Sequence, residues 1–520
     1  MSPERVGKGG RAVLGGVLVA VALGIALLAG GCGSSSSSDV RVGGSAYPGI
    51  DTANTRHASG AIDSANAAGL EVAWTLPLTA KSSYGSYAST PVISKGVVYA
   101  QDLESNVQAI DLESGDVLWE KSYHQPDQGP NGLTVAAGRV YGATSDAAFA
   151  LDQKTGKQIW STPLLRRPSE GIDMAPGYHD GLVYVSTEPG NVNGGYNAGS
   201  VGILWALDAK TGKKAWHFNT VPDDLWSKQN GQLNSGGGLW YAPSFDGKGN
   251  MYFGTGNPAP FPGTAKFPWG SSRPGPDLYT DSVVKLDAKT GKLEWYYQQT
   301  PHDIYDWDMQ NPPVLVKAGG RELAIGSGKV GVVVALDAKS GKVVWKRSVG
   351  IHNGHDNDDL YAMRGEYSKL HESATATVFP GLLGGVIAPI ATDGKTLFVP
   401  VVNHSVTIDS QTSPSESQSL TGELVALDVA SGKVEWSKKF SSAAFGAPTV
   451  INDLVFMATF DGTLHAFSAR TGGEVWQASL PAGSNSGLAV DGDSVVVPAG
   501  IPTVEGQTPE LVAYEIEGKE

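Results

Sequence analysis

Apolar and polar positions alternate in short runs along most of this chain, and the runs come in pairs. In VVKLDAKTGKLEW, at 283–295, an apolar run ends at Leu286 and Asp287, a polar turn follows, and a second run closes with Trp295. This pattern predicts two strands joined by a tight turn. We expect the Asp287 side chain to bond the backbone of that turn, and Gly291 to adopt the positive φ that closes it.

The same unit recurs through the chain, and each copy ends in a tryptophan. The eight anchors are Trp74, Trp119, Trp160, Trp216, Trp295, Trp345, Trp436 and Trp476. Upstream of most copies lies a second apolar pair, such as PVISKGVVYAQD at 91–102, so each unit is predicted to hold four strands. Radial repetition of four-stranded antiparallel sheets builds a β-propeller. We therefore predict an all-β, eight-bladed propeller over 62–520, with the run at 511–517 completing the blade that Trp74 begins.

An open solenoid is the alternative architecture for a repeating chain. Solenoid units are more uniform in length and need polar caps. Here the intervals 216–295 and 345–436 are much longer than the others, which favours a closed ring with insertions. Extra residues inserted into a rigid scaffold usually serve a site.

The first residues predict an export signal. Arg5, Lys8 and Arg11 precede an apolar stretch that ends at LLAGGC, with the only cysteine, Cys32, at its close. This resembles a bacterial lipoprotein signal: 1–31 would be removed, Cys32 would be lipidated, and 32–61 would form a flexible linker. The chain would then be exported and anchored to the cell membrane on its outer side. An uncleaved membrane anchor is the alternative, because 12–31 is just long enough to span.

Charge and cysteine content exclude several classes. With 52 acidic and 38 basic residues the formal charge is −14, and no basic cluster follows the N-terminus, so a nucleic-acid footprint is not expected. A single cysteine excludes an internal disulfide, and it excludes a covalently attached c-type haem, which needs CxxCH.

The segment GGGLWYAPSFDGKGNMYFGTGNPAPFPG, at 236–263, carries a family resemblance. It is similar to a segment of the eight-bladed alcohol dehydrogenases that use pyrroloquinoline quinone (PQQ), and the repeat itself resembles their quinoprotein motif. The resemblance implies that Trp240 is the floor for the quinone and that Asn257 supplies an oxygen to a metal ion. Taken alone, Trp240 is equally compatible with a core position and Asn257 with a turn.

Two further stretches extend the resemblance. TPHDIYDWD, at 300–308, resembles the family's TPHDxWD, which implies that Asp306 is the catalytic base and also lies at the metal. Asp308 falls where lanthanide-dependent members add a carboxylate. In GSGKVG, Lys329 matches the cation that touches the quinone oxygens. The alternatives are a solvated acidic loop and a surface lysine.

The pattern also departs from the family. The family's acidic metal ligand lies in GAEFGVRG; the same frame here is GYNAGSVG, which puts Asn197 where a glutamate is expected as metal ligand. The vicinal cysteines that cover the quinone are absent, and 129–135 occupies roughly that region. Ala88 stands where many members carry a cofactor-binding glutamate.

The function implied by the resemblance is the oxidation of a small alcohol with PQQ and a bound Ca²⁺ or lanthanide ion. Electrons would pass to an external acceptor such as a cytochrome c, because the chain has no haem site. The alternative is a non-enzymatic propeller of the same repeat, acting as a binding or assembly scaffold in the cell envelope.

Repeat phase predicts a rim around the site. Asp306 and Asp356 each lie eleven residues beyond an anchor tryptophan, and loops after the same strand of adjacent blades emerge on one face. Such a rim could hold a second cation or restrict the entrance, but a solvated acidic loop is the simpler interpretation. The residues expected there are His352, His355, Asp356, Asp358, Asp359, Asp223 and Asp224.

Overall fold

The computed structural model describes residues 46–190, 199–223, 225–231, 234–370, 375–408, 414–417 and 419–516. Cys32, Asn197 and Asp224 lie outside these residues, so the predictions made for them stay predictions. The packed region begins at 46, earlier than the predicted boundary at 62. None of the helices in the described part of the chain has the length and apolar character needed to cross a bilayer.

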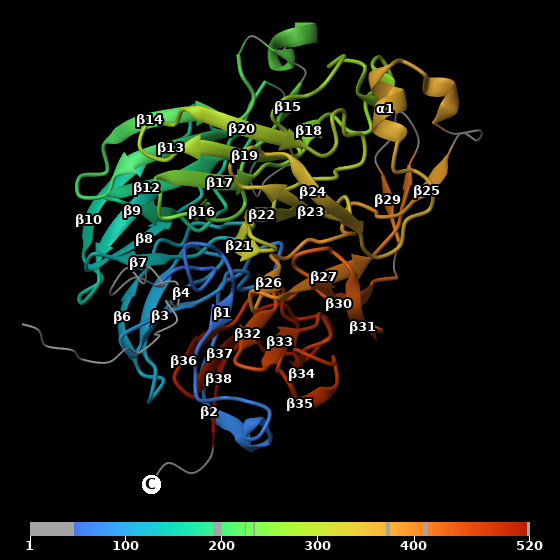
Figure 1. Cartoon of the computed structure of the whole chain (residues 1–520). Helices are drawn as coiled ribbons and strands as arrows, with labels where there is room; N and C mark the ends of the chain where they lie inside the picture. Colours follow the sequence, from blue (N-terminus) through green and yellow to red (C-terminus); the bar gives the residue numbers. More distant parts are fainter. Residues whose placement is uncertain are drawn as a thin grey trace, which may run out of the picture. The chain divides into compact units, whose positions relative to one another are not determined.

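Eight blades of four antiparallel strands each form the described part of the propeller, as the repeat predicts, and in one blade a fifth strand, described below, pairs in parallel with the first (Figure 1). Blades 1 to 3 contain β3 (Val92–Ser94), β4 (Val97–Gln101), β5 (Val107–Asp111), β6 (Val117–Lys121), β7 (Thr134–Ala136), β8 (Arg139–Ala143), β9 (Ala147–Asp152), β10 (Gln158–Pro163), β11 (Gly177–His179), β12 (Leu182–Thr187), β13 (Ile203–Asp208) and β14 (Lys214–Asn219). Blades 4 and 5 contain β16 (Ser244–Phe245), β17 (Asn250–Gly254), β19 (Ser282–Asp287), β20 (Leu293–Gln298), β21 (Val314–Ala318), β22 (Arg321–Ser327), β23 (Val332–Asp337) and β24 (Val343–Ser348). Blades 6 and 7 contain β26 (Ala391–Thr392), β27 (Thr396–Asn403), β30 (Thr421–Asp428), β31 (Val434–Phe440), β32 (Thr449–Ile451), β33 (Leu454–Ala458), β34 (Thr463–Ser468) and β35 (Glu474–Ser479).

The eighth blade joins the two ends of the propeller. It contains β36 (Ala489–Asp491), β37 (Ser494–Ala499), β38 (Glu510–Ile516) and, on its outer edge, β2 (Leu70–Pro77). β2 pairs antiparallel with β38 from Leu70 opposite Ile516 to Pro77 opposite Glu510. The prediction that the run at 511–517 completes this blade is confirmed.

The insertions in the two long intervals form elements of their own. Blade 4 carries the pair β15 (Ser235–Gly236) and β18 (Pro258–Ala259), and blade 6 carries the small sheet of β25 (Ala376–Val378), β28 (Val406–Ile408) and β29 (Ser415–Glu416). In Figure 1 these elements and α1 lie toward the top of the view. The helices are η1 (Ala67–Gly69), η2 (Trp226–Gly231), η3 (Pro268–Gly270), α1 (Asp358–Met363) and η4 (Tyr367–Lys369).

The repeated motif builds the contact between successive blades. The Asp287 carboxylate accepts the N–H of Thr290 at 2.8 Å, and Gly291 has a φ of +72°, which confirms the predicted turn. Each anchor tryptophan except Trp476 packs against the turn glycine of the next blade; a Cβ on Gly341, for example, would lie 2.8 Å from the Trp295 ring. Trp476 instead contacts Tyr514 edge to face, with ring centroids 5.4 Å apart. We call these seven tryptophan–glycine contacts the latches.

The segment Ala46–Ala58 runs across the inner strands of several blades. Its last residues form β1 (His57–Ala58), which pairs parallel with β32. Backbone N–H groups of Phe245, Leu315 and Thr392, in blades 4, 5 and 6, donate to carbonyls of 52–55 at 2.7–3.0 Å. The sequence of this segment is polar, but backbone hydrogen bonds hold it in the propeller.

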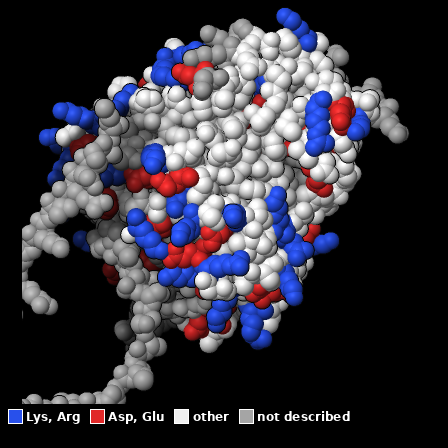
Figure 2. Space-filling model, turned by 45° about the horizontal axis from the view of Figure 1, so that its top comes forward, with Lys and Arg blue, Asp and Glu red and all other residues white. Residues whose placement is uncertain are grey.

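Charge is mixed over the surface in view. Figure 2 shows basic and acidic side chains interspersed, beside a wide area that carries few charges. On that face no continuous basic stripe of described residues is visible.

Candidate active site

Four of the sequence-predicted residues meet in one buried cluster. The Lys329 Nζ lies 2.8 Å from Asp306 Oδ2 and 2.7 Å from Asp308 Oδ2, and it sits 4.5 Å from the centroid of the Trp240 ring. Lys329 and Asp308 are buried, whereas Trp240 keeps part of its ring exposed. The predicted base, cation and platform therefore share one site, as the family resemblance implies.

Asn257 joins the same cluster through its backbone. Its N–H donates to Asp308 Oδ1 at 2.5 Å, while its side-chain Oδ1 is buried and has no hydrogen-bond partner among the described residues. A buried amide oxygen without a donor is costly unless a ligand satisfies it. This oxygen is therefore a candidate ligand for a cation.

Local backbone geometry places these groups. Asp303 accepts the N–H groups of Tyr305 and Trp307, each at 2.8 Å, and so holds the loop in which Asp306 adopts a φ of +63°. Gly328 makes a close approach: a Cβ there would lie 1.9 Å from the carbonyl oxygen of Asp308. Because residue 328 is a glycine, the chain after β22 can pass close to the Asp308 backbone, which places Lys329 beside the loop that carries Asp306.

The electrostatics of the cluster favour a bound cation or a held proton. Burial raises the pKa of Asp306 well above its usual range; the charge of Asp308 adds to this, and the Lys329 ammonium opposes it. Burial also raises the pKa of Asp308, again against Lys329. One ammonium cannot neutralise two carboxylates, so the site retains an uncompensated negative charge when both are ionised.

The donors fit a hard metal ion. Asn257 Oδ1 and the carboxylates of Asp306 and Asp308 are oxygen ligands of the kind that Ca²⁺ takes. No cluster of three or more His, Cys, Asp or Glu side chains suited to a metal ion occurs in the described ranges. The candidate set is thus two carboxylates and an amide, with Asn197 outside the described residues.

A second group of buried acids was not predicted. Asp127, Asp173 and Glu188 are each no more than 4% exposed, and Gln128 Nε2 donates to Asp173 Oδ2 at 2.6 Å. Burial, followed by the charge of Asp173, raises the pKa of both Asp127 and Glu188 well above the usual range. Asp308 contributes to the shift at Glu188, which links this group to the Lys329 cluster.

These acids bear on whether the quinone fits. PQQ carries carboxylates, and ionised acids would repel them, whereas a protonated carboxyl donates a hydrogen bond. The raised pKa values favour the protonated form. With the partly exposed Trp240 ring and Lys329, the residues present fit a planar anionic ring.

The sequence held one indication of this second group of acids, because the charged Glu188 directly follows the apolar strand β12.

The rim residues contact the loop that carries Asp306. Tyr305 donates its hydroxyl to Asp358 Oδ2 at 2.5 Å, and His355 Nδ1 lies 2.8 Å from the same oxygen. His352 Nδ1 lies 2.6 Å from Asp356 Oδ1. The predicted proximity of 352–359 to the loop around Asp306 is confirmed, and its use is structural: Asp358 is buried and bonded rather than solvated.

The blades and their tryptophan latches define a propeller of the quinoprotein type. Its candidate site holds the Trp240 indole, the Asn257 amide, the Asp306 and Asp308 carboxylates and the Lys329 ammonium. A family model described as glucose/ethanol/alcohol dehydrogenase, beta-propeller domain, matches 46–139 and 182–326. A second, described as outer membrane protein assembly factor BamB, matches 375–520. In sequence and fold the chain is similar to the propellers of the quinoprotein alcohol dehydrogenases.

Relatives of known function share most of the chain. The quinohemoprotein alcohol dehydrogenase of Comamonas testosteroni is 29% identical over 517 residues, covering 86% of this chain and 71% of the relative. Its crystal structure superposes with a TM-score of 0.77 at 26% identity, over 91% of this chain and 81% of that one. The lanthanide-dependent methanol dehydrogenase of Methylorubrum extorquens is 26% identical over 517 residues, covering 84% and 82%. A europium-containing methanol dehydrogenase shares the fold, with a TM-score of 0.75 at 19% identity over 90% and 97%.

Proposed function

We propose that this protein oxidises a small alcohol with bound PQQ and a Ca²⁺ or lanthanide ion. The observation that carries the proposal is the Asp306–Lys329–Asp308 cluster beside a partly exposed Trp240 and an unpartnered Asn257 oxygen. The names of the relatives, alcohol and methanol dehydrogenases, support the same reaction class.

The chain's own residues have separate tasks in this reaction. Asp306 would accept the hydroxyl proton of the alcohol at a carboxylate oxygen, and the neighbouring Lys329 ammonium favours its ionised form. Lys329 and Trp240 would orient the planar ring, and Asn257 and Asp308 would hold the metal. When bound, the quinone and its metal supply the electron-accepting chemistry that no side chain here provides. An external carrier such as a cytochrome c takes the electrons onward.

Asp308 is the residue that bears on the choice of metal. A second loop carboxylate adds negative charge at the site, which favours a trivalent lanthanide over Ca²⁺. We therefore propose the lanthanide as the preferred ion, in keeping with the lanthanide-dependent methanol dehydrogenase among the relatives.

The test is a reconstitution with purified protein. PQQ binding is followed by its absorption with either Ca²⁺ or La³⁺, and alcohol oxidation by a dye acceptor. Asp306→Asn should lower activity by about 10²–10⁴-fold while PQQ still binds. Asp356→Asn, on the exposed part of the rim, is the matched control and should leave activity unchanged. Absence of saturable PQQ binding with both metals would refute the proposal.

The alternative function is a binding scaffold in the cell envelope. The match of 375–520 to the BamB model favours it, as do the missing vicinal cysteines and the alanine at Ala88. In that case the wild type and Asp306→Asn would behave alike in every redox assay.

Export and anchoring are part of the proposal. The signal-like sequence before Cys32 supports a lipid-anchored protein facing outward from the membrane. Labelling cells with a fatty-acid analogue should mark the wild type, and Cys32→Ser should carry no label. Equal labelling of both would contradict the anchor.

A further inference from the structure

Arg56 is a buried cation without an acidic partner. It is 3% exposed; its Nε donates to the carbonyl of Pro448 at 2.9 Å and its Nη1 to that of Pro48 at 3.1 Å. Its Nη2 is buried and makes no hydrogen bond. By contrast, the buried Arg273 and Lys329 each pair with a carboxylate. Among the described residues, no carboxylate lies within ion-pair distance of Arg56.

Isolation of this charge is energetically unfavourable. An unpaired charge removed from water is strongly destabilising, so buried charges are normally paired. Burial lowers the pKa of Arg56 to about 10, and the nearby Tyr241 opposes this shift. Tyr241 is neutral at physiological pH, so it supplies no counter-charge.

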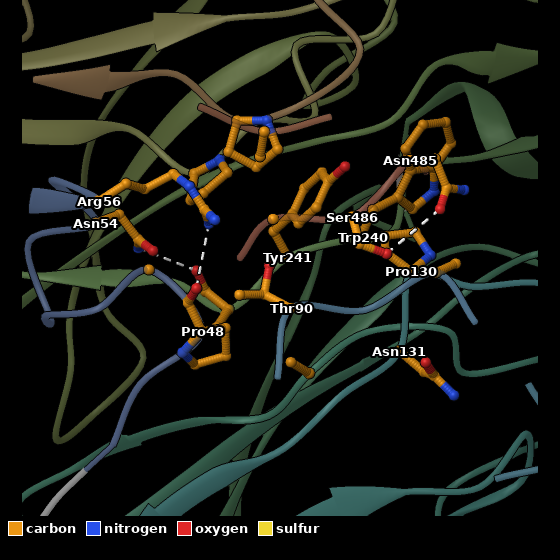
Figure 3. A pocket seen from close by; sticks show the side chains of 18 residues that line it. Pro48, Asn54, Arg56, Thr90, Pro130, Asn131, Trp240, Tyr241, Asn485 and Ser486 are labelled. Atoms are coloured by element: carbon orange, nitrogen blue, oxygen red, sulfur yellow. Dashed lines mark hydrogen bonds between the residues drawn. The ribbon is translucent and has the colours of Figure 1, made fainter. Parts of the chain in front are cut away.

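A cavity adjoins the guanidinium. Its volume is about 40 Å³, and no acidic residue lines it. The lining includes Arg56, Thr90, Tyr241, Asn485 and Ser486, together with Ala88, Asn131 and Trp240 of the proposed quinone site. In Figure 3 Arg56 enters from one end and Tyr241 lies between it and Trp240, so the Arg56 end is set apart from the Trp240 platform. A water needs roughly 10–15 Å³ on this scale, so the space holds a few waters or one small ion with water.

The cavity has the composition of an anion site. Guanidinium, hydroxyl and amide groups supply hydrogen-bond donors, and the remaining walls are largely proline, alanine and glycine. The segment Ala46–Ala58 brings the charge there: Val450 N–H donates to the Arg56 carbonyl at 2.8 Å, which fixes this residue to blade 7.

We propose that this cavity binds one small monovalent anion of chloride size against the Arg56 guanidinium. A single positive charge matches a single negative one, and the volume accommodates a chloride ion with water. The anion would supply the counter-charge that the described residues do not. The cavity also reaches Trp240, so the test is made without quinone or metal, and its failure would leave the proposed function untouched.

The direct experiment is crystallography with bromide. Crystals of the wild type grown or soaked in NaBr should show an anomalous peak within hydrogen-bonding distance of the Arg56 guanidinium. Water alone at that place, in crystals with bromide bound elsewhere, would overturn the proposal. This experiment needs no variant, so it decides the question even if substitutions at Arg56 impair folding.

A solution experiment measures the same binding. At constant ionic strength, replacing sodium gluconate by NaCl should raise Tm by about 1–3 °C, because a ligand of the folded state stabilises it by mass action. Arg56→Gln should lose this chloride-specific rise. Arg139→Gln is the control, since Arg139 also donates to a carbonyl but lies outside the cavity. An equal chloride response in Arg56→Gln would contradict the site.

Discussion

Substitution of a latch glycine tests whether the tryptophan contacts hold the blades together. Gly341 has a φ of +68°, and a Cβ there would lie 2.8 Å from two atoms of the Trp295 ring. Left-handed backbone costs a side-chain-bearing residue about 1–2 kcal/mol. Overpacking against the ring adds about 1–3 kcal/mol, because the indole is fixed by its own hydrogen bond to the Ala338 carbonyl at 3.2 Å. Gly341→Ala should therefore lose about 2–5 kcal/mol in total.

A matched glycine separates the two contributions. Gly320 also has a positive φ, +75°, but a Cβ there meets nothing within 4 Å. Gly320→Ala should therefore lose only the backbone cost, about 1–2 kcal/mol. Urea titrations followed by tryptophan fluorescence compare the two variants. Equal losses of stability would refute the idea that the ring contact, rather than the turn conformation, requires glycine.

Two further predictions concern charge. Lys329→Met removes the ammonium that pairs with Asp306 and Asp308, so it should destabilise the metal-free protein by about 3–5 kcal/mol. Added La³⁺ should restore most of the lost Tm. No recovery of Tm with La³⁺ would argue against the metal site. Burial and neighbouring acids raise the pKa of Asp359 to about 7, so its contribution to stability is present below about pH 4 and is lost as pH rises to 7. In Asp359→Asn the free energy of unfolding should fall less with rising pH, by up to about 4 kcal/mol, because each unit of pKa shift corresponds to about 1.36 kcal/mol. Parallel curves of stability against pH for variant and wild type, from pH 4 to 8, would contradict this assignment.

The blades could be predicted from sequence because each is a local motif. Apolar runs, the turn carried by Asp287 and Gly291, and the closing Trp295 lie within a few residues of one another, and the motif repeats often enough to number the blades. The segment Ala46–Ala58 could not be placed in the same way. It is polar, and backbone hydrogen bonds to distant strands hold it, which no side-chain pattern records.

The candidate site, too, could be predicted only where a local sequence motif carries the residue. Trp240, Asn257, Asp306 and Lys329 were found because motifs carry them, and the structure brings them together as predicted. Glu188 and Asp173 were missed because their significance depends on which loops converge. Arg56 lies in a stretch predicted to be a linker, so its isolation from any carboxylate is visible only in three dimensions.

Closure of the ring by β2 and β38 makes folding depend on two strands that lie far apart in the sequence. Leu70 pairs with Ile516, so almost every other blade is synthesised before β2 meets its partner. At about 5–20 residues per second, that strand edge waits on the order of tens of seconds. An edge left open is prone to pair with another chain. A chain that stops before β38 would leave the edges of β2 and β37 unpaired. Such products should aggregate or be degraded by proteases.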